Sequence, residues 1–199
     1  VDSGATYMDG TTDITRTYPL GELTEDERKF YTWTLQCHID IAKAVWLDYC
    51  DCHMIDTIAR EPLWRHLINY RCGTGHSVSF VGNVHEGPHA LNGRNTTLMR
   101  PGMIVTDEPG VYETDLVGIR IENELVCVHK ADNQYGTFLG FEPIMFVPIA
   151  TSPIVPGVLT KDELDWLNNY HRQVFEKLAP RLNDEEREWL AKKCAAIGC

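Results

Sequence analysis

Between residues 104 and 123 the chain alternates apolar and polar residues around a short polar break. One face carries Val117, Ile119 and Ile121, and the other carries Gly118, Arg120 and Glu122, the pattern of a strand with one buried face. The break at 113–115 predicts a turn centred on Asp115. In an antiparallel hairpin, two residues whose numbers average to the turn centre lie opposite each other. The spacing therefore predicts a hairpin in which Glu108 faces Glu122.

Five side chains in short, unusual contexts have the chemistry of a two-metal hydrolase site. They are Asp2, Asp13, His76, Glu108 and Glu122. Four carboxylates and one imidazole are hard, mostly anionic ligands that suit Mn²⁺, Zn²⁺ or Co²⁺. They also carry enough negative charge to hold two dications close together. Any one of these acids alone would more simply be a loop or strand-surface carboxylate, so the hypothesis depends on the whole set.

The aspartate pair restricts the first hairpin. The strongest turn signal near Asp2 and Asp13 is Asp9-Gly10. A two-residue turn there sets Asp13 against Thr6 and leaves Asp2 roughly 13 Å along the strand. Because metals in such sites lie about 3.5–4 Å apart, that register excludes a shared site. The metal hypothesis therefore requires a wider loop, roughly Gly4 to Gly10, with Asp2 facing Asp13.

Short motifs occur in order along nearly the whole chain. They are Asp2-Ser3-Gly4-Ala5, residues 9–17, Gly73-Thr74-Gly75-His76, Asn83-Val84-His85-Glu86-Gly87-Pro88, Thr106-Asp107-Glu108-Pro109-Gly110 and Gly118-Ile119-Arg120-Ile121-Glu122-Asn123. Together they resemble aminopeptidase P, or Xaa-Pro aminopeptidase, a pita-bread metallopeptidase related to methionine aminopeptidase and prolidase. Residues 141–149 and 166–171 resemble the cytosolic, three-domain branch. The resemblance implies an α+β, creatinase/aminopeptidase-like fold with a curved antiparallel sheet backed by helices, a cytoplasmic location and a homodimer.

The resemblance also implies a cofactor of two divalent metal ions, with Mn²⁺ the first expectation and Zn²⁺ or Co²⁺ the alternatives. One ion would be held by Asp13, His76, Glu108 and Glu122. The other would be held by Asp2, Asp13 and Glu122. Asp13 and Glu122 would then bridge the two ions.

The activity that the resemblance implies is hydrolysis of the N-terminal Xaa-Pro bond of a peptide with proline at its second position. A hydroxide between the metals would attack the scissile carbonyl. Glu108 would help to move its proton, and His85 would donate a hydrogen bond or a proton near the scissile bond. Arg120 is close to the site in the family, and we expect it to orient an acidic neighbour.

Two features depart from the family pattern. Cys72 stands four residues before His76, where the family commonly has a histidine, and a thiol cannot carry a positive charge. The chain also begins one residue before Asp2, whereas the family has an amino-terminal domain and half of the catalytic domain upstream. We therefore expect a piece of a longer protein, with residues 1–150 as the C-terminal portion of a catalytic domain and 151–199 as a helical extension.

Three other functions stay open at this point. A pita-bread protein that has lost its ligands can be a protein-binding module, although such relatives lack several of the five metal residues. Prolidase or methionine aminopeptidase activity is the enzyme alternative. An inert fragment is the third, because the upstream half that supplies a substrate-binding histidine is absent.

Composition limits the partners. The net charge of −11 argues against binding to nucleic acid. No stretch reaches the ~20 apolar residues of a membrane span. The seven cysteines form no CxxC pair, so free thiols are more plausible than a structural zinc site at Cys50, Cys52 and His53. Of the histidines outside the motifs, His89 stays undecided, and the others fit the surface or a satisfied core: His38, His53, His66, His129 and His171.

The remaining sequence predicts the element order. Residues 1–18 form a hairpin, and a capping box of Thr24 and Glu27 opens a helix to about Leu47. Its apolar stripe predicts a core face from Phe30 to Val45. A second helix spans about 53–67, interrupted or kinked at Pro62. Strands and loops fill 72–150, and helices close the chain at about 162–178 and 184–196, an order that suits the α+β class.

Overall fold

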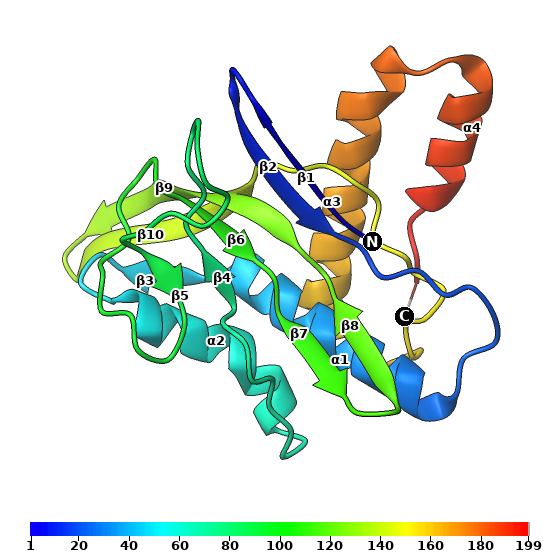
Figure 1. Ribbon diagram of the computed structural model, residues 1–199, viewed down its shortest axis with the longest axis horizontal. Helices are drawn as coiled ribbons and strands as arrows, with labels where there is room; N and C mark the ends of the chain where they lie inside the picture. Colours follow the sequence, from blue (N-terminus) through cyan, green and yellow to red (C-terminus); the bar gives the residue numbers. More distant parts are fainter. Residues whose placement is uncertain (199) are drawn as a thin grey trace.

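An antiparallel sheet lies at the centre of the computed structural model, which describes residues 1–198. Its strand order is β3-β10-β9-β6 (Figure 1). The strands are β3 (Val45–Leu47), β6 (Ile104–Asp107), β9 (Asn123–Asn133) and β10 (Gly136–Pro143). Buried side chains such as Leu125 and Leu139 fix which face is inward, because successive side chains of a strand alternate between faces. The prediction of strands within 72–150 is confirmed.

A second ladder continues the β6–β9 pair. It joins β7 (Gly110–Glu113) to β8 (Val117–Arg120). Asp107 pairs with Asn123 and Gly110 with Arg120, so both ladders have one register centred on Asp115. Asp115 has a φ of 58°, a turn conformation that Asp tolerates better than most residues. The predicted turn centre is confirmed, and the register places Glu108 opposite Glu122 at the break between the ladders.

The first hairpin differs from the prediction. β1 (Asp2–Tyr7) pairs with β2 (Gly10–Thr15) across a two-residue turn at Met8-Asp9. Asp2 opposes Thr15 and Gly4 opposes Asp13, so the expected wide loop with Asp2 facing Asp13 is wrong. The turn falls one residue before Asp9-Gly10, and this shift makes Asp2 and Asp13 diagonal neighbours on one face.

Helix α1 (Glu25–Ala42) begins as predicted, with the reciprocal capping box of Thr24 and Glu27. The predicted end at Leu47 is wrong, because residues 45–47 form β3 and pair with β10. Val45, expected in the core, is consequently 55% exposed. Helix α2 (Cys52–Trp64) has Asp51 as its N-cap and contains Pro62 near its end.

The C-terminal helices are close to their predicted bounds. They are α3 (Lys161–Leu178), the short 3₁₀ helix η1 (Ala179–Arg181) and α4 (Asp184–Lys193). A capping box of Thr160 and Glu163 starts α3, and Asn183 caps α4. Charge follows the helix dipole in α4, whose first turn is acidic and whose last turn is basic.

Three apolar clusters meet along α1, of which two are large. Ile41 packs with Val105 and Leu125 of the sheet, whereas Leu35 packs with Ile121 and with side chains of α3. Figure 1 shows α1 and α2 on one side of the strands, and α3 with α4 beside the β1–β2 hairpin. Within residues 1–198, no helix has both the length and the apolar composition needed to cross a bilayer.

Candidate metal centre

The centre forms where the two ladders of the long hairpin are interrupted. At this break the amide of Glu108 donates to the carbonyl of Thr74 at 2.7 Å, and the amide of Glu122 donates to the carbonyl of Thr15 at 3.1 Å. The backbone amides of Glu108 and Glu122 therefore do not hydrogen-bond across the hairpin to each other's residue. These bonds attach β2 on one side and the short β4 (Gly75–His76) on the other, so chain segments distant in sequence meet at the break.

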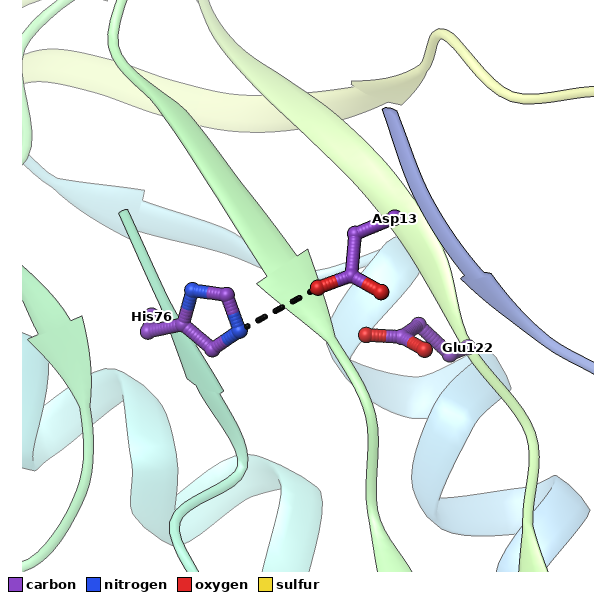
Figure 2. Close-up of side chains that lie close together, drawn as sticks. All are labelled: Asp13, His76 and Glu122. Atoms are coloured by element: carbon purple, nitrogen blue, oxygen red, sulfur yellow. Dashed lines mark ion pairs between the residues drawn. The ribbon is translucent and has the colours of Figure 1, made fainter. Parts of the chain in front are cut away.

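Three predicted ligands converge there. Asp13, His76 and Glu122 each offer a donor atom, and these atoms all lie within 4.8 Å of one another. Figure 2 shows the three side chains pointing toward a common point, Asp13 from β2, His76 from β4 and Glu122 from the position just before β9. His76 Nε2 lies 3.5 Å from Asp13 Oδ2 and 3.2 Å from Glu108 Oε1, which brings a fourth predicted ligand to the edge of the group.

Asp2 lies outside this group. Its side chain is 58% exposed and forms an ion pair with Arg120. Arg120 also donates from Nε to Thr15 Oγ1 at 3.0 Å and from Nη1 to Tyr112 Oη at 2.6 Å. Its Nε lies 3.9 Å from Glu108 and 4.0 Å from Glu122. Arg120 therefore contacts the acids from the exposed side, and Asp2 stays a predicted ligand of a second ion.

The structure places His85 and Cys72 at the rim. The exposed His85 ring lies against the His76 ring, with centroids 3.8 Å apart. The Cys72 thiol faces the carbonyl of Gly110 at 3.5 Å and is also exposed. A rim position gives the His85 imidazole access to a substrate without making it a ligand.

Three polar residues of the site were missed in the sequence. Thr15 donates to Glu122 Oε2 at 2.6 Å, and Thr106 Oγ1 accepts from the His76 amide at 2.9 Å. Glu124, which is 3% exposed, has an oxygen without a hydrogen-bond partner among the described residues. Each lies two positions from a predicted ligand, so the two-residue period of a strand was the signal that could have found them.

The electrostatics follow from crowding of acids. Burial raises the pKa of Glu122 to about 8, helped by the charges of Glu108 and Asp13 and opposed by the Thr15 hydrogen bond. Burial raises the pKa of Glu124 to about 7. Burial lowers the pKa of His76, but hydrogen bonds to Asp13 and Glu108 outweigh it and raise that pKa to about 10. The cluster thus has an excess of acids that a further cation would stabilise in their ionised form.

The donor set fits a divalent cation. His76 Nδ1 lies 3.1 Å from the carbonyl of Ser77, which can only accept, so Nδ1 carries the proton of the neutral ring. That tautomer leaves the Nε2 lone pair directed at the acids, the orientation typical of metal-ligating histidines. Carboxylate oxygens and one imidazole nitrogen match the donors preferred by Mn²⁺, Zn²⁺ and Co²⁺.

Most other histidines lie away from this group. His53, His66 and His129 are exposed, and His38 and His171 are buried with hydrogen-bond partners. His89, undecided from the sequence, is buried and donates from Nε2 to the carbonyl of Ile104 at 2.7 Å. Among residues 1–198 the cysteines are free thiols.

Comparison with known proteins places this geometry in context. Residues 1–129 match metallopeptidase family M24, and residues 137–197 match the C-terminal region of peptidase M24. The chain is 44% identical to aminopeptidase P1 of Lotus japonicus over 99% of its length and 45% identical to aminopeptidase P2 of Arabidopsis thaliana over 96%. It spans only 31% and 28% of those two proteins.

Solved structures show the same fold. X-prolyl aminopeptidase from Caenorhabditis elegans, described as a cytosolic enzyme with a di-nuclear active site, superposes over 98% of this chain and 33% of its own, with a TM-score of 0.91 and 37% identity. Prolidase from Pyrococcus furiosus matches 71% of this chain and 39% of its own, with a TM-score of 0.60 and 28% identity. The predicted α+β, pita-bread fold with a curved antiparallel sheet and helices is confirmed.

Proposed function

The chain belongs to metallopeptidase family M24, and on that premise we propose that it serves the hydrolysis of N-terminal Xaa-Pro peptide bonds with two divalent metal ions as cofactor. The observation that carries this proposal is the convergence of Asp13, His76 and Glu122 donor atoms within 4.8 Å. The similarity to proteins named aminopeptidase P supports the substrate class, a peptide with proline at its second position.

We assign the ligands as the family resemblance implies. Asp13, His76, Glu108 and Glu122 would hold one ion, and Asp2, Asp13 and Glu122 would hold the other. When bound, the ions supply Lewis acidity, which polarises a peptide carbonyl and lowers the pKa of a coordinated water. Asp2 would have to exchange its ion pair with Arg120 for this role, which an exposed side chain can do at small cost.

The chain's own groups have distinct tasks in this proposal. Glu108 lies within 3.2 Å of His76 Nε2 at the edge of the cluster, where it can accept a proton from the attacking water. His85 at the rim would donate a hydrogen bond or a proton near the scissile bond. Arg120 holds Asp2 and Thr15, so its task is to orient these groups rather than to react.

The proposed metal is Mn²⁺. Zn²⁺ and Co²⁺ are the alternatives, because the same donors accept all three and availability decides between them. A cytoplasmic location is likewise part of the proposal, supported by the description of the nematode enzyme as cytosolic. We also propose a homodimer, and a single monomeric mass in light scattering at high protein concentration would contradict it.

The test is cleavage of Xaa-Pro-Yaa tripeptides with added Mn²⁺, by the 199-residue chain and by any longer protein that contains it. Release of the free N-terminal residue is the expected result. The Glu122→Gln variant is the matched negative control, and Xaa-Ala-Yaa peptides test the demand for proline. A longer protein that binds Mn²⁺ yet releases no Xaa would defeat the proposal.

Prolidase activity is the second candidate, since several similar structures are prolidases. The higher TM-score of the X-prolyl aminopeptidase, 0.91 against 0.60, favours the first. Xaa-Pro dipeptides separate the two, and peptides beginning with Met test methionine aminopeptidase activity. A protein-binding module without catalysis is disfavoured because all five predicted ligand residues are present.

A further inference from the structure

A buried polar network lies directly behind the proposed metal centre. Asp107 precedes Glu108, and Asn123 follows Glu122, so strand alternation turns both to the face opposite the ligands. Asp107 and Asn123 pair with each other in the sheet, and neither has any exposed surface. Each of these two network residues is therefore joined to one of the glutamates by a single peptide bond.

His38 of α1 joins these two residues. Its Nδ1 lies 3.0 Å from Asp107 Oδ2, and its Nε2 lies 3.3 Å from Asn123 Nδ2. Asn123 Oδ1 accepts from Arg16, so the amide nitrogen of Asn123 faces His38 and donates to Nε2. The remaining ring proton is then on Nδ1, directed at Asp107.

Arg16 is the centre of the network. Its Nη1 donates to the carbonyls of Thr15, at 2.8 Å, and Glu122. Its Nη2 donates to Asn123 Oδ1 at 2.8 Å and to the carbonyl of Val147 at 2.7 Å. One planar side chain thus fixes the end of β2, which carries Asp13, to the start of β9, beside Glu122.

Tyr170 connects this centre to the C-terminal region. Its hydroxyl accepts from Arg16 Nη2 at 2.9 Å and from the Val147 amide at 3.2 Å. As a donor it has three acceptors within reach: the Met145 carbonyl at 3.0 Å, Asn123 Oδ1 at 3.1 Å and the Val147 carbonyl at 3.2 Å. The ring stacks on Trp166, with centroids 5.4 Å apart and planes 2° from parallel, which fixes the hydroxyl relative to α3.

The cost of this arrangement argues for a role beyond packing. Arg16 is 3% exposed, and within residues 1–198 its hydrogen bonds go to carbonyl, amide or phenol oxygens rather than to a carboxylate. Burial of a guanidinium that hydrogen-bonds to no carboxylate is expensive, even though its donors are satisfied and the buried Asp107 carboxyl is near enough to interact with its charge. The hydrogen bonds of Arg16 hold Thr15, Glu122 and Asn123 together, next to the proposed ligands Asp13 and Glu122.

We propose that Arg16 and Tyr170 are positioning residues of the metal centre, through which α3 of the C-terminal region sets the placement of Asp13 and Glu122. The inference rests on the metal ligands assigned in the proposed function. Neither residue reaches the donor atoms, so both act through Thr15, Glu122 and Asn123.

The test compares two buried tyrosines. Tyr170→Phe removes the hydroxyl from the network, whereas Tyr31→Phe removes an equally buried hydroxyl that donates to the carbonyl of Ala150 at 2.7 Å. Mn²⁺ affinity is measured by calorimetry on the 199-residue chain, with the Co²⁺ absorption spectrum as a report on coordination geometry. We expect Tyr170→Phe to weaken affinity by about 10-fold or more and to change the Co²⁺ spectrum, since loss of a group that orients ligands typically costs 10–100-fold.

Tyr31→Phe should bind within about two-fold of the parent chain, even where both variants lose similar thermal stability. Arg16→Lys keeps the charge but loses the planar, forked guanidinium, and it should behave like Tyr170→Phe. Arg28→Lys, at a half-buried position outside the network, is its control. Equal Mn²⁺ affinity and an unchanged spectrum in Tyr170→Phe would overturn the inference, as would a parent chain that binds no divalent cation. Metal binding without Xaa-Pro cleavage would defeat the proposed function alone.

Discussion

Glu122 shows how one residue can oppose stability in favour of a site. Its side chain is 1% exposed, and burial together with Glu108 and Asp13 raises its pKa to about 8. Because the folded pKa lies above the unfolded value of 4.5, the metal-free native state binds the extra proton. The contribution of Glu122 to the stability of the native state is therefore fully present below pH 4.5, and it is lost as the pH rises toward 8.

Glu122→Gln should separate stability from binding. In EDTA the parent chain should lose up to about 1.4 kcal/mol per pH unit between pH 4.5 and 8 through this group, and the variant should lose that slope. Its Mn²⁺ affinity should fall about 100-fold or more, since even groups behind the ligands cost 10–100-fold. Denaturant unfolding and calorimetry measure the two effects. The control is Glu142→Gln, at an exposed ion pair with Lys130, which should change neither the pH slope nor the Mn²⁺ affinity. A Glu122→Gln variant with the Mn²⁺ affinity of the parent chain would exclude Glu122 as a ligand.

For single residues, the sequence predicted which side chains meet at the candidate centre better than it predicted the contacts of the residues around them. Asp13, His76 and Glu122 meet as expected because each lies in a short motif with few local alternatives. Arg16 lies in one of the same motifs, yet its partners Val147 and Tyr170 come from more than 130 residues away. Contacts of that range depend on how elements pack, which no local pattern encodes.

At the scale of elements, β4 depends on a close approach to β6. A Cβ on Gly75 would lie 1.7 Å from the carbonyl oxygen of Thr106, whereas one on Gly73 would meet nothing nearer than 3.5 Å. Gly75 thus lets the strand that carries His76 lie against the break in the long hairpin.

Gly75→Ala should displace β4 and with it His76. We expect a loss of about 1–3 kcal/mol in unfolding free energy, typical of overpacking, and a clear loss of Mn²⁺ affinity. Gly73→Ala in the same motif is the matched control and should leave both nearly unchanged. Thermal unfolding with and without Mn²⁺ would decide, and full Mn²⁺ affinity in Gly75→Ala would show that β4 does not place a ligand.

Helix α3 makes the fold sensitive to acid. Burial and the charge of Arg16 lower the pKa of His171 to about 4 against an ordinary 6.5, although its Nε2 accepts from the Ile149 amide. The unfolded chain therefore binds a proton that the native chain does not, and stability from this group is lost as pH falls from 6.5 to 4.

The expected slope in that window is about 1.4 kcal/mol per pH unit. His171→Gln keeps an acceptor for Ile149 but cannot titrate, so the contribution should vanish from urea unfolding curves measured between pH 4 and 7. His129→Gln, at an exposed position, should keep the parent slope. An unchanged slope in His171→Gln would show that this histidine is protonated in the native state.

Some ends of helices and strands are determined by neighbouring residues in the sequence, and others are determined by distant ones. The capping box at Thr24 fixed the start of α1, whereas its end was misplaced because residues 45–47 are recruited by β10 some 90 positions later. The turn at Asp115 was predictable from alternation on both sides of it. The β1 strand is exposed throughout, so no apolar pattern specified its register, and the prediction rested on turn chemistry alone.

At the scale of the whole molecule, the proposed metal centre is a junction. Asp13 comes from the first hairpin, His76 from β4 and Glu122 from the long hairpin, and three apolar clusters meet along α1. Ions that bind only this convergence bind the native state and not the unfolded chain. Metal binding should therefore stabilise all three segments together.

Addition of Mn²⁺ at about 100 times its dissociation constant should raise the unfolding free energy by about 2.7 kcal/mol. For a chain of this size that corresponds to roughly 5–10 °C in the melting temperature. Differential scanning calorimetry with increasing Mn²⁺ measures the shift, and EDTA should reverse it. Glu122→Gln should show little of this shift, because the convergence then lacks the carboxylate of its most buried proposed ligand. An equal shift in that variant would place the stabilising ion elsewhere on the acidic surface.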